Sequence, residues 1–484
     1  MSIETVAIRE LNRTTHPAPA AEAKIVHIGL GAFHRAHQAW YTAKAGDAWG
    51  IAAFTGRSAT AATELAAQDG LFTLIERGAD GDSFEVIDSI VAAHDGADTA
   101  ALIAALASPS TAIVTLTITE AGYKLAPGSA EPTLNLADEQ VSADLEILRA
   151  SYDAGVFAKN LAEIKNLALS TTAARLVVGL AARRSADGWP LAVVSCDNLP
   201  GNGAVTRAGI LGFAEAVDVM LARWIETNIS FVDTSIDRIT PRTTQVDRDT
   251  VAAETGFRDV SPVVTEPFSS WVLSGDFPAG RPAWEKAGAQ FVDDLEAFER
   301  RKLWLLNGAH TLMSFAGQLR GHTTVAEALA DQAVSGWVEE FWDAASAHLG
   351  EPELKVPEYR GALRERFENP RIAHFLAQIA TDGSIKLAAR ALPVFRAEAA
   401  AGRDGQAALR LVAAWCDQLT AQHPAGTPVA DANAGALEKI LADPAIRPGS
   451  PQQTSALLDV LETGLGDDTS LVATVHALRG QFNA

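Results

Sequence analysis

The chain has 484 residues, of which 48% are hydrophobic, and its formal net charge at pH 7 is −21. This length is too great for a single hydrophobic core, so we expect at least two domains. The strong negative charge argues against a nucleic-acid partner, which would need a basic face, and against binding to an anionic membrane surface.

The sequence also indicates the cellular location of the protein and the redox state of its cysteines. The N-terminus lacks the apolar stretch of a signal peptide, and no window approaches the roughly 20 apolar residues of a membrane span. The two cysteines, Cys196 and Cys416, are 220 positions apart and show no metal-ligand spacing. We therefore expect a cytoplasmic protein with reduced thiols and without a disulfide framework.

The first part of the chain alternates between apolar runs and helical patterns. After an irregular lead-in at residues 1–23, strands are predicted at 24–28, 49–54, 112–118, 191–196, 229–232 and 263–272. Strands that alternate with helices predict an α/β fold with a largely parallel sheet covered on both faces.

The pattern changes after about Gly288. From Phe291 to the end, helical periodicity is interrupted only by turns rich in proline and glycine, and no strand is predicted. We therefore predict two domains, an α/β domain over residues 1–288 and a mostly α-helical domain over residues 289–484.

The first predicted strand runs into the glycine turn Gly29-Leu-Gly31-Ala32-Phe33. A strand, a Gly-x-Gly turn and a helix together can bind a pyrophosphate, because the backbone comes close and the helix N-terminus attracts negative charge. His34 stands where the usual third glycine would be, so an ordinary strand–turn–helix fits the turn equally well. His34 and His37 have no third ligand nearby in sequence, and no metal is expected.

The end of the second predicted strand bears on the choice of cofactor. NAD sites often have an acidic residue there, about 20 residues after the glycine turn. This chain has Thr55-Gly56-Arg57-Ser58 instead. Arg57 suits a 2′-phosphate or a stack on adenine, and it can equally be a simple loop arginine. NAD and NADP therefore both remain open.

Lys302, Asn307 and His310 lie within one apolar, helix-like segment. At 100° per residue, Asn307 lies about 140° round an α-helix from Lys302, and His310 lies between them, so one side of the helix can present all three groups to a single pocket. A buried lysine of lowered pKa can take the proton of an alcohol, while Asn and His hydrogen-bond the oxygen. The alternative is that all three are solvated or structural helix residues.

Six motifs occur in order at residues 29–37, 117–123, 195–203, 232–241, 279–284 and 302–310, with a weaker one at 382–386. With these motifs the chain resembles the mannitol dehydrogenase family, the polyol-specific long-chain dehydrogenases/reductases. That family includes mannitol and arabinitol dehydrogenases and the fructuronate and tagaturonate reductases. The resemblance implies a metal-independent NAD(P) enzyme with a Rossmann-type N-terminal domain and a helical C-terminal substrate domain.

The resemblance also implies roles for residues at matching positions. Lys302 would be the general base, Asn307 and His310 the donors to the substrate oxygen, and Glu299 a proton relay. The implied cofactor-binding residues are Gly29, Gly31, Ala32, Phe33, Arg57 and Glu120.

Asn198, Asp237 and Lys386 would bind substrate. Asn198 and Asp237 also follow predicted strands, and ligands bind outside the carboxyl ends of parallel strands. Asn198 can alternatively be a turn residue and Asp237 an ion-pair partner of Arg238. Glu120 can cap a turn or approach the nicotinamide ribose. A family arginine before Lys386 is replaced, with Gln378 in its place.

The expected function is the interconversion of a sugar alcohol, of the mannitol, arabinitol or sorbitol type, and its ketose by hydride transfer to or from NAD or NADP. The first alternative is a hexuronate reductase, whose substrate carboxylate would be bound by Lys386, Arg371 or Arg390. The second is a dinucleotide-binding protein without catalysis. The expected partner is a small polyol or ketose, and the expected assembly a monomer or small homo-oligomer.

Overall fold

The computed structural model describes residues 8–56, 58–128, 131–153, 167–423 and 426–482. The chain forms two compact units, Met1–Leu295 (unit 1) and Glu296–Ala484 (unit 2). Among the described helices, none is both long and apolar enough to cross a membrane.

Unit 1 is built on an eight-stranded sheet of described residues. Its order is β13 (Gln290–Phe291), β12 (Ser270–Ser274), β9 (Ile229–Asp237), β8 (Leu191–Ser195), β7 (Ile113–Leu116), β2 (Ala23–Ile28), β3 (Gly50–Phe54) and β6 (Ile90–His94). The six strands from β9 to β6 are parallel, and β12 pairs antiparallel with β9. The largely parallel sheet predicted from the sequence is confirmed.

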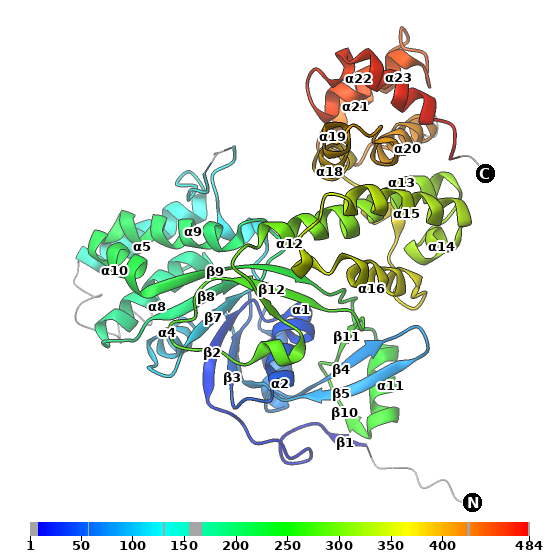
Figure 1. Ribbon diagram of the computed structural model, residues 1–484. Helices are drawn as coiled ribbons and strands as arrows, with labels where there is room; N and C mark the ends of the chain where they lie inside the picture. Colours follow the sequence, from blue (N-terminus) through cyan, green and yellow to red (C-terminus); the bar gives the residue numbers. More distant parts are fainter. Residues whose placement is uncertain (1–7, 57, 129–130, 154–166, 424–425, 483–484) are drawn as a thin grey trace, which may run out of the picture. The chain divides into compact units, whose positions relative to one another are not determined.

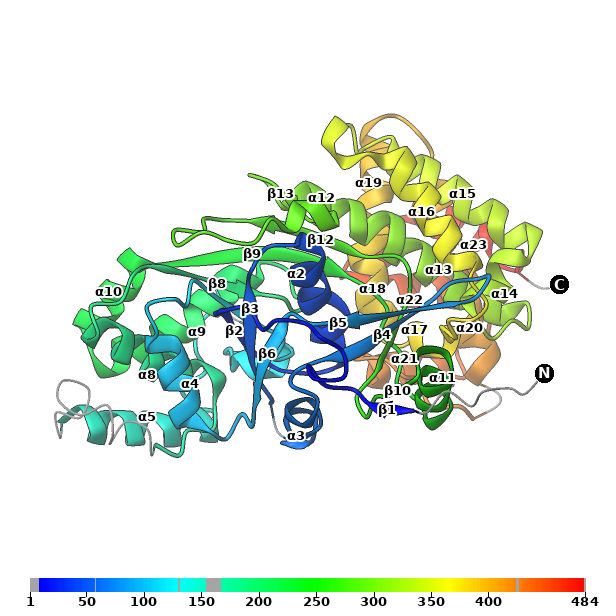
Figure 2. The same cartoon turned by 90° about the horizontal axis from the view of Figure 1, so that it is seen from below.

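Two small sheets complete the strands of unit 1. One contains β11 (Val263–Thr265), β4 (Phe72–Arg77) and β5 (Asp82–Ile87), and the other contains β1 (Arg9–Glu10) and β10 (Phe257–Arg258). Figures 1 and 2 show α11 (Gln245–Thr255) beside these strands, where Val251 packs on Ile75 and Val264.

Helices cover both faces of the large sheet (Figures 1 and 2). One face is covered by α4 (Thr99–Ala107), α8 (Thr172–Ser185), α9 (Asn202–Val217) and α10 (Val219–Asn228), with α5 (Glu139–Asp153) packed on α8 and α9. The other carries the continuous helix formed by α1 (Ala32–His34), the π-helix η1 (Arg35–Ala39) and α2 (Trp40–Ala45). The remaining helices of unit 1 are α3 (Thr60–Ala67) and the 3₁₀ helices η2 (Glu120–Tyr123) and η3 (Trp284–Ala287).

The strand sequences explain this two-sided burial. In β7, Val114 and Leu116 belong to the core under α4 and α8, whereas Ile113 belongs to the core under α1 and α2. Successive side chains of a strand point to opposite faces, so a strand buried on both sides must be apolar throughout.

Three strand predictions need correction. The strand predicted at 263–272 is two strands, β11 and β12, in different sheets. Pro267 lies between them and cannot donate to a β ladder, which favours the break. Strand β9 extends beyond the predicted end at residue 232 to Asp237. Strands β4, β5 and β6 were not predicted, and Gln290–Phe291, at the edge of the predicted helical region, is strand β13.

Unit 2 is helical, and its described residues form no strand, in agreement with the prediction. Its helices are α12 (Glu296–Arg301), the π-helix η4 (Lys302–Gly308), α13 (Ala309–Leu319), α14 (Val325–Ala330), α15 (Gln332–Ser346), η5 (Pro352–Leu354), α16 (Val356–Glu368), α17 (Leu376–Ile379), α18 (Gly383–Arg390), α19 (Leu392–Ala400), α20 (Gln406–Gln422), α21 (Ala434–Ala442), α22 (Pro451–Leu461), η7 (Leu465–Asp467) and α23 (Thr469–Leu478).

Helix α13 is the centre of unit 2. Nine consecutive residues, 309–317, are buried, and the helix packs against α14, α15, α17 and α20. A helix that is buried all round must satisfy or use each of its polar groups, because no water reaches them. The polar side chains at the start of α13 and in the π-helix before it are therefore candidates for a binding or catalytic site.

Candidate active site

A pocket of about 510 Å³ opens in unit 1 at the carboxyl ends of β2, β7, β8 and β9. It is lined by Gly29, Gly31, Ala32, Phe33, His34, Thr117, Thr119, Glu120, Cys196, Asp197, Asn198, Leu199 and Ile236. Parallel strands end at one edge of a sheet, so segments far apart in sequence meet there. The structure thus brings six predicted site residues together, whereas predicted Arg57 lies outside the described residues.

The glycine turn is held tightly against the segment after β7. Gly29 has φ +109°, and a Cβ atom there would lie 2.0 Å from the carbonyl oxygen of Thr117. The Thr117 hydroxyl donates to the Gly29 carbonyl at 2.8 Å. At Gly31, by contrast, a Cβ would meet nothing closer than 3.6 Å. Gly29 is therefore required by the fold, while Gly31 keeps the pocket open to a ligand.

Two buried histidines support this turn. The rings of His27 and His34 stack with centroids 3.3 Å apart, and His27 is fixed by the hydroxyls of Thr115 and Thr117. Burial lowers the pKa of His27 to about 3 and holds that of His34 well below its ordinary value. Both rings are therefore neutral at physiological pH. Within the described residues, no cluster of His, Cys, Asp or Glu could hold a metal ion.

Asp197 lines the pocket and was not among the residues predicted from the sequence. Its carboxylate accepts hydrogen bonds from the backbone amides of Ile118 and Thr119, both at 2.9 Å, and from the Tyr123 hydroxyl at 2.7 Å. It therefore fixes the segment that carries Glu120, in which Thr119 has a φ of +67°. An acidic residue directly after the strand, next to Asn198, was the available signal.

Asn198 and Asp237 both occupy strand ends, as predicted. Asn198 is exposed at the pocket, three residues after Ser195, where β8 ends. Asp237 is the last residue of β9, follows the pocket residue Ile236, and lies opposite Ser270 of β12. Arg238, its suggested ion-pair partner, instead pairs with Glu76 at 3.0 Å.

In unit 2, the segment that carries Lys302 and Asn307 is a π-helix, whereas the sequence analysis assumed α-helical geometry. The i→i+5 hydrogen bonds of a π-helix bring residue 307 nearly above residue 302, and π turns are frequent at functional sites. Lys302 and Asn307 are partly exposed, in contrast to the buried Trp304, Leu305 and Leu306. The π turn thus brings the lysine and the amide closer together around the helix than the roughly 140° separation expected for an α-helix.

His310 follows in the first turn of α13. Its ring lies 4.7 Å from the rings of both Phe367 and His374, and its Nε2 has no hydrogen-bond partner among the described residues. Burial, and then the nearby charges of His374, Arg366 and Arg390, hold the pKa of His310 well below its ordinary value. The imidazole is neutral, and its buried Nε2 has an unused hydrogen-bonding position.

The remaining predicted residues of unit 2 lie on neighbouring helices. Glu299 is half-buried on α12, three residues before Lys302. The Lys386 ammonium donates to the Ile379 carbonyl at 3.0 Å and to the Thr381 hydroxyl at 3.4 Å. Burial, reinforced by Arg390, lowers the pKa of Lys386. Gln378 is exposed on α17.

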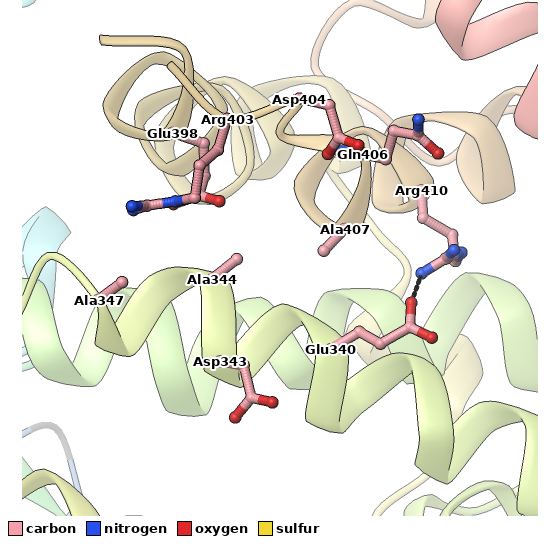
Figure 3. A pocket seen from close by; sticks show the side chains of 10 residues that line it. All are labelled: Glu340, Asp343, Ala344, Ala347, Glu398, Arg403, Asp404, Gln406, Ala407 and Arg410. Carbon is pink, nitrogen blue, oxygen red and sulfur yellow. Dashed lines mark hydrogen bonds and ion pairs between the residues drawn. The ribbon is translucent and has the colours of Figure 1, made fainter. Parts of the chain in front are cut away.

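Unit 2 contains a separate groove that is not part of this candidate site. It is a groove of about 590 Å³ between α15 and the segment that joins α19 to α20 (Figure 3). Four of its charged groups form ion pairs within the unit: Glu340 pairs with Arg410, and Glu398 with Arg403. None of the predicted site residues lines it.

Known protein families account for nearly the whole chain. Residues 23–286 match the mannitol dehydrogenase Rossmann domain, and residues 294–479 match the mannitol dehydrogenase C-terminal domain. Together the two matches place the glycine turn in the first domain and Lys302, Asn307 and His310 in the second.

Individual relatives indicate the same family. The chain is 35% identical to the mannitol 2-dehydrogenase of Cereibacter sphaeroides over 84% of this chain and 83% of the relative. It is 36% identical to the D-mannonate oxidoreductase of Escherichia coli strain K12 over 78% and 75% of the two chains. A solved ternary complex of Pseudomonas fluorescens mannitol 2-dehydrogenase with NAD and D-mannitol matches with a TM-score of 0.73 and 34% identity, over 98% and 96% of the two chains. The resemblance seen in the sequence is confirmed: the chain belongs to the mannitol dehydrogenase family of oxidoreductases.

Proposed function

We propose that this protein interconverts a sugar alcohol and its ketose, with NAD as hydride carrier and Lys302 as the general base. The observation that carries the proposal is the π-helix η4, which sets Lys302 and Asn307 on one face just before the neutral, buried His310. A mannitol 2-dehydrogenase that is 35% identical to this chain supports a polyol as substrate.

The pocket of unit 1 fits a dinucleotide. Backbone at Gly29, Gly31, Ala32 and Phe33 can approach a pyrophosphate, and Glu120 lies where it can meet a ribose. The fit rests on the open space at Gly31, where a side chain would begin to fill the pocket. When bound, NAD supplies the acceptor for a hydride. The relative solved with NAD favours NAD over NADP.

The residues of unit 2 would manage the proton and the oxygen. Lys302, in its neutral form, removes the proton from the hydroxyl of the carbon that is oxidised. Asn307 donates to the same oxygen through its amide. His310 donates through Nε2, which requires the tautomer protonated there. Glu299, one turn earlier, passes the proton from Lys302 to solvent. Ketose reduction follows the reverse order, and no metal is needed in this scheme.

Three further side chains would bind the rest of the substrate. Asn198 and Asp237 stand at adjacent strand ends in unit 1, and their amide and carboxylate suit sugar hydroxyls. Lys386 in unit 2 offers an ammonium that is already oriented by the Ile379 carbonyl.

A hexuronate is the second candidate substrate, and one observation favours it. The positive groups Arg366 and Arg390 act on His310 in a buried setting, where a carboxylate would be attracted. The 36% identity to a D-mannonate oxidoreductase points the same way. The candidate cations for that carboxylate are Lys386, Arg371 and Arg390.

The test is a substrate panel read at the NADH absorbance band. Mannitol, arabinitol and sorbitol are oxidised, and fructose, fructuronate and tagaturonate are reduced, each with NAD and with NADP. We expect turnover of at least one polyol–ketose pair with NAD, and turnover at least about 10²-fold slower in the Lys302→Ala variant. Preference for uronates by more than tenfold in kcat/KM would select the second candidate. Tight NAD binding with no turnover of any member would instead support a dinucleotide-binding protein without catalysis.

A further inference from the structure

We propose that Arg390 is a positioning residue that holds the π turn of η4, and with it the side chain of Asn307, in register with Lys302. The proposal builds on the function proposed for Lys302 and Asn307, but its structural part can be tested independently of any activity.

The contacts form a closed triangle. The Arg390 Nη1 atom donates to the backbone carbonyl of Asn307 at 3.3 Å and to the hydroxyl of Thr311 at 2.9 Å. The Thr311 hydroxyl in turn donates to the same Asn307 carbonyl at 2.9 Å. One carbonyl at the end of the π turn therefore receives two side-chain donors, one local and one from a different helix.

The Asn307 carbonyl lies at the junction between the π-helix η4 and the α-helix α13. Residues 302–308 are π-helical and residues 309–319 are α-helical. Such a change disturbs the regular backbone hydrogen-bond ladder, and side-chain donors can compensate. Without them, the lower-energy α register becomes competitive. In that register, Asn307 would turn to about 140° from Lys302, away from the shared face.

The charge of Arg390 supports the same assignment. Burial lowers the pKa of its guanidinium to about 10, and among the described residues no carboxylate forms an ion pair with it. A mostly buried cation without an acidic partner is destabilising unless dipoles compensate it. The Asn307 carbonyl and the C-terminal end of α18, where Arg390 is the last residue, are such dipoles.

Arg390 also connects two parts of the proposed site. It belongs to the same helix, α18, as Lys386, and α18 packs against η4. A shift of α18 would move the substrate lysine and loosen the π turn together.

The first measurement is hydrogen–deuterium exchange of the full-length chain, followed by mass spectrometry. In Arg390→Met, we expect amides of residues 302–312 to exchange at least tenfold faster than in the native protein, with exchange in unit 1 unchanged. The matched control is Arg396→Met on neighbouring α19, which removes an exposed ion pair with Glu462 and should leave residues 302–312 as they are. Exchange within twofold of native in Arg390→Met would overturn the proposal.

The second measurement is steady-state kinetics with the best substrate of the panel. A positioning role predicts that kcat falls at least tenfold while the KM for NAD stays within twofold. Arg390→Lys keeps a charge and a donor and should recover part of the loss. If Arg390→Met does not fold, the same exchange comparison is made with Arg390→Gln, which removes the charge and shortens the side chain, and native-like exchange together with native-like kcat in that variant would refute the role. If the native protein turns over no substrate, the exchange result still decides the proposal.

Discussion

The two π-helical turns, one in each unit, differ in what they expose. In η1 of unit 1 all five residues, Arg35–Ala39, are buried. In η4 of unit 2, Lys302 and Asn307 are partly exposed although the rest of the turn is largely buried. The pocket of unit 1 is lined mainly by loops at strand ends, whereas in unit 2 the π turn itself carries the proposed reactive groups Lys302 and Asn307.

The two units therefore position their candidate site residues in different ways. In unit 1, sheet topology alone gathers the glycine turn, Glu120 and Asn198, and buried groups such as His34 and Asp197 support them. In unit 2, the register of one helical turn decides which side chains share a face. Substitutions at the site in unit 1 should therefore reduce NAD binding and the free energy of unfolding, and substitutions at the site in unit 2 should reduce kcat.

The largest effect is expected from Lys302→Ala. Loss of a general base should lower kcat by about 10²–10⁴-fold, while the Kd for NAD, measured by fluorescence titration, stays near native. Lys302→Arg is the matched control, because arginine keeps the charge but cannot act as a neutral base, so it should be about as inactive. A kcat within tenfold of native in the alanine variant would remove Lys302 from its role.

Gly29→Ala should have the next largest effect. The added Cβ would lie 2.0 Å from a backbone oxygen, so the turn must shift, and we expect a loss of about 3 kcal/mol or more in unfolding free energy. Gly31→Ala meets no atom closer than 3.6 Å and should keep native stability while weakening NAD binding. Urea unfolding and NAD titration of both variants would test this. Equal stability of the two variants would contradict the strain at Gly29.

Acid should destabilise the protein through its buried histidines. The folded-state pKa values of His27, His34 and His310 lie below the ordinary value, so the unfolded chain binds more protons. The contribution of these neutral histidines to the free energy of unfolding is therefore fully present above about pH 6.5. It is lost as the pH drops below that value, by up to about 1.4 kcal/mol per pH unit for each histidine.

Urea unfolding at pH 7.5, 6.5 and 5.5 would measure this slope. His34→Gln should flatten it, and substitution of the exposed His423 by Gln should not. Because unit 1 holds two of the three histidines, hydrogen exchange at pH 5.5 should increase there first. A stability that does not change between pH 7.5 and 5.5 would contradict the buried neutral rings.

The smallest effect is expected from Asp197→Asn. The amide keeps one acceptor oxygen for Ile118 or Thr119 but loses the charge, so we expect a loss of about 1–3 kcal/mol in unfolding free energy. NAD binding should weaken moderately because the segment with Glu120 is held less firmly, while kcat is little changed. The exposed Asp80→Asn is the control. A drop in kcat beyond that of Gly31→Ala would point to a direct role for Asp197.

Much of this protein could be predicted from its sequence. The apolar runs of β2, β7 and β8 are buried on both faces, so their composition alone indicated a parallel sheet, and the glycine turn followed from Gly29 and Gly31. The family was evident from motifs whose residues are local in the chain. These features depend on near neighbours, which a sequence displays directly.

Tertiary structure decided the rest. Strand β4 of a small side sheet was not predicted, and it pairs with β11, almost 200 residues away, as well as with its neighbour β5. The three bonds to Asp197 come from a segment some 75 residues earlier. Above all, the sequence gives Lys302 and Asn307 but not the π register that aligns them, since a register depends on which donors reach a carbonyl, and Arg390 arrives from 83 residues away.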